Sequence, residues 1–274
     1  TISSTISIGC KISGLQEGVV RFKSLLFFLI TNPKSVKILI ISFSATLKPV
    51  ILELGGKDPL IVLKDADKKR AVEAILFGGL SNAGQTCISV EEVYIESDVF
   101  DFYKEKLSDR IKNMSSGVGA DMELGSMIMK ENCIKVKEHI NEIEDKSSVV
   151  CGKVAPEGMF IAPTLIINPP GSARVVNEET FGPVFCVTKI KNIDDAIRHA
   201  NNSDYGLGGS LWTSNITLAK KVVNKINTGA VFINEMTKSD PRLPFGGINK
   251  SGYGIELSKH GIREFVNIKT IVVN

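Results

Sequence analysis

The sequence predicts an α/β fold in which helices cover both faces of a mainly parallel sheet. Three observations support this prediction. Helical and strand-like patterns alternate from residue 51 onward, short turn signals separate them, and 43% of the 274 residues are hydrophobic. A chain of this length and composition can bury a large core, and a typical domain size of about 150 residues suggests two domains.

The expected elements follow one another along the chain. Apolar runs at residues 25–30 and 38–43 predict two buried strands in a first segment that differs in texture from the rest. Apolar residues at helical spacing predict helices over 67–80, 99–111, 136–143 and 219–226, and strands are predicted at 90–95 and 230–233. The alternating stretch 265–273 predicts a last strand, either an ordinary edge strand or one that pairs with another subunit.

Charge and cysteine content exclude several classes of protein. Lys and Arg number 33 against 30 Asp and Glu, a net charge of +3 that does not indicate binding to nucleic acid or to a membrane surface. The five cysteines include no CxxC pair, and the three histidines show no metal-ligand spacing and are expected at the surface. We therefore expect no metal site, no signal peptide, no membrane span and a cytoplasmic location.

Two residues could perform chemistry. Cys87 lies in a loop between a predicted helix and a predicted strand, where a thiolate could attack an electrophilic carbon and a backbone amide could hold the resulting oxyanion. Glu53 lies in an apolar strand that runs into Gly55 and Gly56, so burial should raise its pKa and let it act as a general base. The alternatives are a buried, inert cysteine and a strand-end glutamate bonded to a turn, and Lys57 is expected to be a solvated turn residue.

No dinucleotide or P-loop signature is present, but four motifs in the correct order closely resemble the NAD(P)-dependent aldehyde dehydrogenases. The motifs are Glu53-Leu54-Gly55-Gly56-Lys57, Gly84-Gln85-Thr86-Cys87, Glu178-Glu179-Thr180-Phe181-Gly182-Pro183, and Pro244-Phe245-Gly246-Gly247 with Lys250-Ser251-Gly252-Tyr253-Gly254. The end of the chain is most similar to succinate-semialdehyde dehydrogenases. The resemblance covers residues from about 48 to 274.

The resemblance implies a role for each matching residue. Cys87 would add to a small aldehyde to give a thiohemiacetal and then a thioester, and Glu53 would activate the hydrolytic water. Succinate semialdehyde is one candidate for the aldehyde. Glu179 would hold the ribose next to the nicotinamide, Phe181 would lie beside the nicotinamide ring, and the Leu54 backbone would lie near its amide. The cofactor would be NAD or NADP, and the last strand would join subunits into a homo-oligomer.

The chain departs from the family pattern in two places. The family's cofactor-domain landmarks, including the asparagine of the oxyanion hole and the Gly-Ser turn that would hold the pyrophosphate, are missing before residue 51. Relatives commonly have an arginine where this chain has Glu92, and Glu91 and Glu92 are expected to disfavour the Cys87 thiolate.

The predicted organisation has three parts. Residues 1–50 would be a shortened remnant of the Rossmann-like cofactor domain, 51–258 the aldehyde dehydrogenase catalytic domain and 259–274 the oligomerisation strand. We expect impaired cofactor binding and weak or absent dehydrogenase activity in this chain alone. The alternative is a noncatalytic, degenerate homologue that acts only as an association module through uncovered apolar surface. Lys238 and Arg242 could bind a substrate carboxylate, but surface charge is the better explanation for both.

Overall fold

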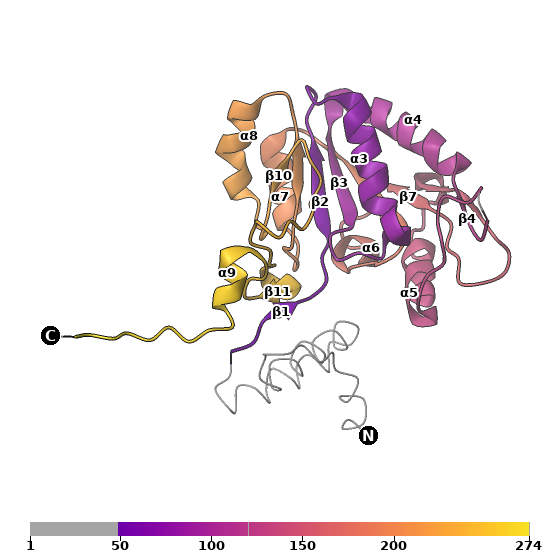
Figure 1. Cartoon of the computed structure of the whole chain (residues 1–274). Coiled ribbons are helices and arrows are strands. Elements are labelled where there is room, and N and C mark those ends of the chain that lie inside the picture. Colours follow the sequence, from indigo (N-terminus) through magenta and orange to yellow (C-terminus); the bar gives the residue numbers. More distant parts are fainter. Residues whose placement is uncertain (1–48, 120, 274) are drawn as a thin grey trace, which may run out of the picture.

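A seven-stranded sheet forms the centre of the protein in the computed structural model, which describes residues 49–119 and 121–273 (Figure 1). The strand order is β10-β9-β2-β3-β8-β7-β5, and every neighbouring pair is parallel except β5 with β7. The strands are β2 (Asp58–Val62), β3 (Val90–Glu96), β5 (Val149–Cys151), β7 (Thr164–Ile167), β8 (Val184–Ile190), β9 (Ser210–Trp212) and β10 (Phe232–Ile233). The predicted α/β class is confirmed.

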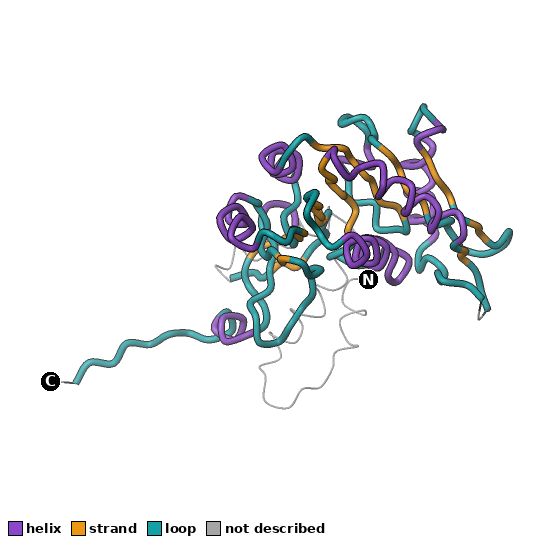
Figure 2. The backbone as a smooth tube through the Cα atoms, turned by 90° about the horizontal axis from the view of Figure 1, so that it is seen from above, coloured by secondary structure: helices purple, strands orange, loops and turns teal. Residues whose placement is uncertain are grey.

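Helices cover both faces of this sheet, as Figures 1 and 2 show from two directions. The helices are α3 (Lys68–Leu80), α4 (Ser97–Asn113), α5 (Lys130–Asn141), α6 (Arg174–Asn177), α7 (Ile193–Asn201), α8 (Ile216–Val222) and α9 (Ser258–Arg263). Side chains alternate along β2, so that Leu60 and Val62 join the core under α3 and α4, whereas Ile61 joins the core under α7 and α8. The sheet is therefore buried on both sides, as parallel sheets require.

Short polar side chains start several of the helices. Asp67 caps α3 by accepting a hydrogen bond from the Arg70 backbone N–H at 3.1 Å, and Asn192 and Asn215 cap α7 and α8 in the same way. The predicted helices at 67–80, 99–111, 136–143 and 219–226 and the strand at 90–95 are all present, with shifted ends. The strand predicted at 230–233 shortens to β10.

The topology brings several loops together at one edge of the sheet. Because β2, β3, β8 and β9 are parallel neighbours, the loops that precede them meet at the end where these strands begin, which we call the amino edge. Beyond this edge lies a small antiparallel ladder of β1 (Leu52–Glu53) with β11 (Gly252–Tyr253), visible below the main sheet in Figure 1. Another small sheet pairs β4 (Ser115–Ser116) with β6 (Lys153–Val154).

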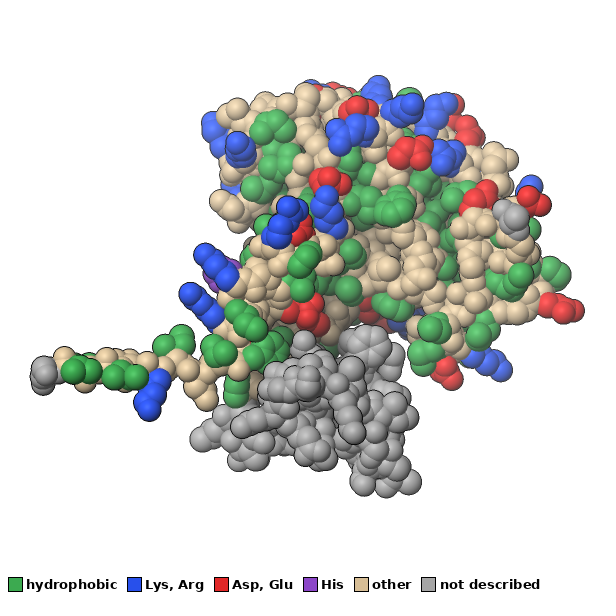
Figure 3. Space-filling view, viewed as in Figure 1, with side chains coloured by type: hydrophobic (Ala, Val, Ile, Leu, Met, Phe, Trp, Pro, Cys, Tyr) green, Lys and Arg blue, Asp and Glu red, His purple; other side chains and the backbone are tan. Residues whose placement is uncertain are grey.

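The prediction of a strand at 265–273 is wrong for the single chain. After α9 the backbone extends away from the body as an arm over residues 267–273, without assigned secondary structure, as Figures 1 and 3 show. Its apolar side chains are exposed, Ile268 at 87% and Val273 at 89%, and it pairs with no strand of the described chain. Pairing with another subunit stays a prediction.

Two further expectations concern the rest of the chain. The strands predicted at 25–30 and 38–43, and with them the proposed remnant at 1–50, lie almost wholly outside the described residues. Among the residues that the structure describes, no helix has the length and apolar character needed to cross a membrane.

Candidate active site at the amino edge

Three segments of the predicted site meet at the amino edge. Residues 53–56 precede β2, residues 84–87 precede β3, and residues 179–181 precede β8. Since β2 pairs with β3 and β3 pairs with β8, the three loops lie side by side. A Cβ on Gly56 would lie 2.1 Å from the Cys87 carbonyl oxygen, which means that the first two segments touch through their backbones. All five predicted site residues thus lie on these three adjoining loops.

The loop that carries Cys87 has an unusual backbone. Asn82 and Ala83 have left-handed φ angles of 53° and 54°, and Gly84 follows at 68°. Glycine is required at 84, since a Cβ there would lie 2.0 Å from the Gly182 carbonyl oxygen. The Gln85 side chain then fixes the loop, its Oε1 accepting from the Ile128 backbone N–H at 2.8 Å. Strain and anchoring together hold Cys87 in a half-buried position.

The surroundings of Cys87 disfavour its thiolate. Burial, and after it the charges of Asp58, Glu53 and Glu179, raise the pKa of Cys87 to about 11. The predicted direction is therefore confirmed, but its predicted source is wrong. Glu91 and Glu92 are not among the charges that raise the Cys87 pKa most, and both carboxyls instead face Lys57. Attack by Cys87 consequently needs a nearby proton acceptor.

Glu53 is such a group. Its strand β1 pairs with β11 in the register Glu53 to Gly252, and the Leu54 N–H donates to the Ser251 carbonyl oxygen at 3.0 Å. Burial raises the pKa of Glu53 to about 7, with a smaller contribution from Glu256. Among the described residues its buried Oε1 has no hydrogen-bond partner. A carboxyl with this pKa and an unpaired oxygen can exchange protons with a water or a thiol.

Glu179 packs against the glycine pair that follows Glu53. Its Oε1 accepts a hydrogen bond from the Gly56 N–H at 2.9 Å, and a Cβ on Gly55 would lie 2.4 Å from its Oε2. Glycine at 55 thus makes room for this carboxylate. Burial raises the pKa of Glu179 to about 7, followed by the charge of Glu91. Leu54 and Phe181 flank the same region and are half-buried, like Glu179.

Lys57 is not the solvated turn residue that the sequence predicted. It is 3% exposed, and its Nζ donates to Glu91 Oε2 at 2.8 Å and to the Val175 carbonyl oxygen at 2.6 Å, with Glu92 Oε1 at 3.3 Å. Burial opposes its charge, but Glu91 and Glu92 outweigh that effect and raise the pKa of Lys57 above its ordinary value. The motif places lysine here because two buried carboxyls require a cation.

Asp58 belongs to the site but was not predicted from the sequence. This residue is 1% exposed, and its Oδ1 accepts from the Gly208 N–H at 2.9 Å. Burial raises the pKa of Asp58 to about 7, and its charge acts on Cys87 more strongly than that of Glu53. An aspartate at the start of an apolar strand directly after Lys57 was the available signal, but its distance to Cys87 depends on strand pairing.

Other predicted surface residues divide into two groups. His139 is fully buried, contrary to prediction, with Nδ1 at 3.2 Å from Thr180 Oγ1, since α5 packs against the 178–181 segment. Arg242 pairs with Asp240 and Lys238 with Glu235 in exposed positions, which agrees with surface charge. No cluster of His, Cys, Asp or Glu suited to a metal ion occurs in the described parts of the chain.

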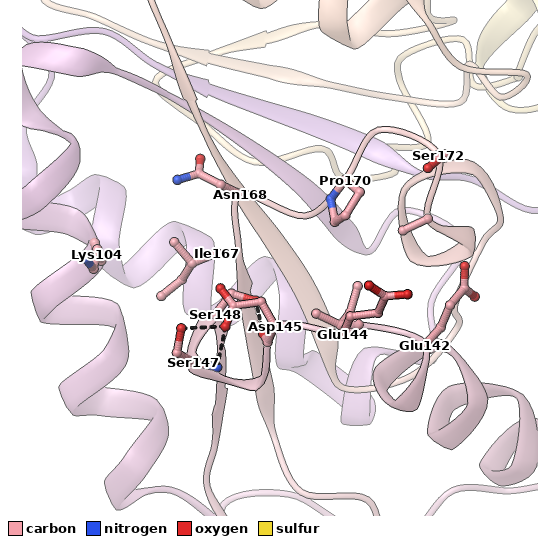
Figure 4. A pocket seen from close by; sticks show the side chains of 12 residues that line it. Lys104, Glu142, Glu144, Asp145, Ser147, Ser148, Ile167, Asn168, Pro170 and Ser172 are labelled. Atoms are coloured by element: carbon pink, nitrogen blue, oxygen red, sulfur yellow. Dashed lines mark hydrogen bonds between the residues drawn. The ribbon is translucent and has the colours of Figure 1, made fainter.

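A hollow of about 710 Å³ lies elsewhere, between α4, the turn after α5 and the loop after β7 (Figure 4). Several of its polar side chains already have hydrogen-bond partners in the protein. Ser147 Oγ donates to Asp145 Oδ1 at 2.6 Å, and Asn168 Oδ1 accepts from the Lys189 N–H at 2.8 Å. None of the predicted site residues lines it.

Comparisons with known proteins identify the family of the chain. The sequence profile described as "Aldehyde dehydrogenase family" matches residues 29–271. "Succinate-semialdehyde dehydrogenase [NADP(+)]" of Mycobacterium leprae (strain TN) is 40% identical over 230 residues, covering 82% of this chain and 50% of that protein. An aldehyde dehydrogenase of Paenarthrobacter nicotinovorans is 37% identical over 233 residues, with coverages of 82% and 50%.

Solved structures of aldehyde dehydrogenases also match the chain. The crystal structure of betaine aldehyde dehydrogenase from Staphylococcus aureus in complex with NAD+ matches with a TM-score of 0.78 and 33% identity, covering 85% of this chain and 48% of that one. A mutant aldehyde dehydrogenase from Bacillus cereus matches with a TM-score of 0.82 and 32% identity, covering 88% and 50%. The chain spans about half the length of the curated relatives that it matches. It belongs to the aldehyde dehydrogenase family.

Proposed function

We propose that this chain carries the thiol and general-base part of an aldehyde dehydrogenase site, which oxidises a small aldehyde to its carboxylic acid with NAD or NADP. The observation that supports this most directly is the meeting of Cys87, Glu53 and Glu179 at the amino edge, where both carboxyls are close enough to raise the pKa of the thiol. The names of the relatives suggest succinate semialdehyde as the aldehyde.

The chemistry begins with proton transfer. Because the Cys87 pKa is about 11, the thiol must give its proton to a neighbour as the sulfur adds to the carbonyl carbon, and Glu53 with a pKa of about 7 can accept it. A bound nicotinamide cofactor would supply the hydride acceptor, and Cys87 would then carry the thioester. Glu53 releases the thiol proton to solvent and then takes a proton from the water that hydrolyses the thioester.

The described residues fit the nicotinamide end of the cofactor. Glu179 presents a carboxylate that suits ribose hydroxyls, and the missing side chain at Gly55 lets that carboxylate pack against the backbone there. Phe181 offers an aromatic ring and Leu54 its backbone from the two flanking loops. Relatives named as NADP enzymes and a solved relative with NAD+ support either nucleotide. The homo-oligomer predicted from the last segment belongs to the same proposal.

The second candidate is the noncatalytic association module. The observation that favours it is the exposed apolar arm at 267–273, which offers a surface for another chain regardless of catalysis. The two candidates differ in whether Cys87 turns over a substrate.

The test uses the purified chain with succinate semialdehyde and NAD or NADP, and follows reduced nicotinamide by absorbance. Turnover should vanish in Cys87→Ala and persist in Cys151→Ala, a matched change at an exposed cysteine. A second arm measures hydrolysis of an activated ester, which needs no nucleotide. It should fall by about 100-fold in Glu53→Gln, with the acyl-enzyme accumulating. If neither reaction depends on Cys87, the enzyme proposal is overturned and the association module stands.

A further inference from the structure

The 178–181 segment is held by side chains from outside it, and Glu91 makes the central contacts. Its Oε2 accepts from the Thr180 N–H at 2.8 Å and its Oε1 from the Phe181 N–H at 2.9 Å. The Tyr205 OH also contacts this segment, accepting a hydrogen bond from the Glu179 N–H at 3.4 Å. One carboxylate therefore caps two consecutive amides directly after Glu179.

These two amides need that acceptor. Thr180 is fully buried, so water cannot replace a lost partner of its N–H, and an orphaned buried amide is strongly unfavourable. Phe181 has a left-handed φ of 53°, a conformation that a bulky side chain adopts only when its surroundings impose it. The Glu91 carboxylate supplies such a constraint at both residues.

The same carboxylate also connects this segment with the Glu53 segment. Its Oε2 lies 2.8 Å from Lys57 Nζ, and the side chains of Lys57 and Glu91 are 1% and 2% exposed. Lys57 is preceded by Gly56, whose N–H binds the Glu179 carboxylate. Glu179 is thus fixed twice with respect to β2, through its own side chain and through Glu91 and Lys57.

We infer that Glu91 is a positioning residue for cofactor binding: with Lys57, it holds the 179–181 backbone so that Glu179 and Phe181 face the nicotinamide ribose and ring. This inference rests on the proposed function, which assigns those two residues to the cofactor. Glu91 itself touches neither substrate nor cofactor, and acts by fixing the backbone on which both residues stand.

Glu92 provides a matched control. It is the next residue of β3, it is 4% exposed, and its Oε1 lies 3.3 Å from the same Lys57 ammonium. No amide of the 178–181 segment donates to it in the described chain. Replacing Glu91 or Glu92 by Gln removes one buried carboxyl facing Lys57 in either case, but only Glu91→Gln disturbs the two caps. The Glu91 carboxylate accepts from donors on both sides, Lys57 Nζ on one and the Thr180 and Phe181 N–H groups on the other. A Gln side chain would have to point its own NH₂ donor at one of them.

The experiment compares wild-type, Glu91→Gln and Glu92→Gln full-length chains. Hydrogen exchange at the Thr180 and Phe181 amides should accelerate by about tenfold in Glu91→Gln and stay unchanged in Glu92→Gln. The Kd for NADP should rise by a similar factor only in Glu91→Gln, whereas the rate of Cys87 alkylation should not move. Equal effects of the two variants on exchange and on Kd would overturn the inference.

A further variant covers the case in which Glu91→Gln does not fold. Lys57→Met with Glu91→Met and Glu92→Met replaces the whole buried triad by apolar side chains of similar size, a change that proteins often tolerate. Its Thr180 and Phe181 amides should exchange rapidly while the rest of the sheet stays protected, and slow exchange there would contradict the inference. If wild type binds no nucleotide, the proposed cofactor role fails for this chain, and the exchange measurement alone decides whether Glu91 holds the segment.

Discussion

At the scale of single residues, the chemistry of the amino edge depends on carboxyls that surround one thiol. Asp58, Glu53 and Glu179 approach Cys87 from two other loops, and each has a pKa of about 7 because burial disfavours its charge. A protonated thiol beside carboxyls that can take its proton is suited to attack in which proton transfer accompanies bond formation. The same arrangement keeps the thiol unreactive toward adventitious electrophiles in its resting state.

This arrangement predicts how Cys87 labels with iodoacetamide. The labelling rate should keep rising with pH up to about pH 10, since the thiolate fraction grows until the pH reaches the Cys87 pKa of about 11. At fixed pH above neutrality, Glu53→Gln should accelerate labelling because it removes one neighbouring negative charge. Mass spectrometry of the Cys87 peptide gives the rate, and the exposed Cys151 serves as internal reference. A plateau near pH 8 would contradict the raised pKa.

At the scale of elements, the turn between α3 and β3 determines where Cys87 lies. Three consecutive left-handed residues turn the chain sharply, and Gly84 packs directly on the Gly182 carbonyl in the loop before β8. Backbone contact of this kind connects the thiol loop to the 179–181 segment without any side chain. Strained turns of this type persist only where neighbouring structure imposes them.

We therefore predict that Gly84→Ala is strongly destabilising. The left-handed φ of 68° and a Cβ only 2.0 Å from a carbonyl oxygen should lower the free energy of unfolding by at least about 2 kcal/mol. Gly125→Ala is the matched control, because no atom lies within 4 Å of its Cβ position, and its effect should stay within about 0.5 kcal/mol. Urea denaturation of both variants measures the difference, and similar values for the two would refute the argument.

At the scale of the whole molecule, the protein buries ionisable groups at one end of its sheet. Four carboxyls have folded-state pKa values of about 7 against ordinary values near 4, the residues being Glu53, Asp58, Glu92 and Glu179. Lys57 offers one buried ammonium to two of the carboxyls in β3. Keeping so much charge out of water reduces stability, as expected where a site is arranged for chemistry rather than for packing.

Stability should therefore fall as pH rises from about 5 to about 8. In this window the folded carboxyls bind more protons than the unfolded ones, so deprotonation favours unfolding. The raised pKa of Lys57 contributes no slope here, because lysine is charged in both states. Urea denaturation across the window should show a smaller slope for Glu92→Gln, whereas Glu105→Gln, whose side chain is 71% exposed, should match wild type. Stability that is flat or rises with pH would disprove this account.

The extended arm leads to a separate prediction about assembly. Its apolar side chains contribute little to the stability of the isolated chain, since they are exposed along 267–273. Deleting residues 267–274 should change the free energy of unfolding of the monomer by less than about 1 kcal/mol but reduce the mass of any oligomer. Light scattering after size-exclusion chromatography measures that mass. An oligomer that survives the deletion unchanged would exclude the arm as its connection.

Much of this could be predicted from the sequence. Helical and strand periodicity determined the α/β class, and the spacing of apolar residues located α3, β3 and α4, because these patterns depend on local geometry and burial of one face. Cys87, Glu53 and Glu179 were identified from their motifs. Such motifs record the residues that a site needs, but not the distances between them.

Only the tertiary structure decided how these residues act on one another. Pairing of β2 with β3, and of β3 with β8, brings Asp58 near Cys87 and puts Lys57 beneath the 179–181 segment, and no local pattern contains that information. The same packing buries His139, and it places the Glu91 and Glu92 carboxyls against Lys57. The arm shows the opposite case: its alternating sequence favours a strand, but a strand forms only by pairing, and the arm pairs with no strand of the described chain. Local preference depends on neighbours in sequence, whereas pKa values and strand formation depend on neighbours in space.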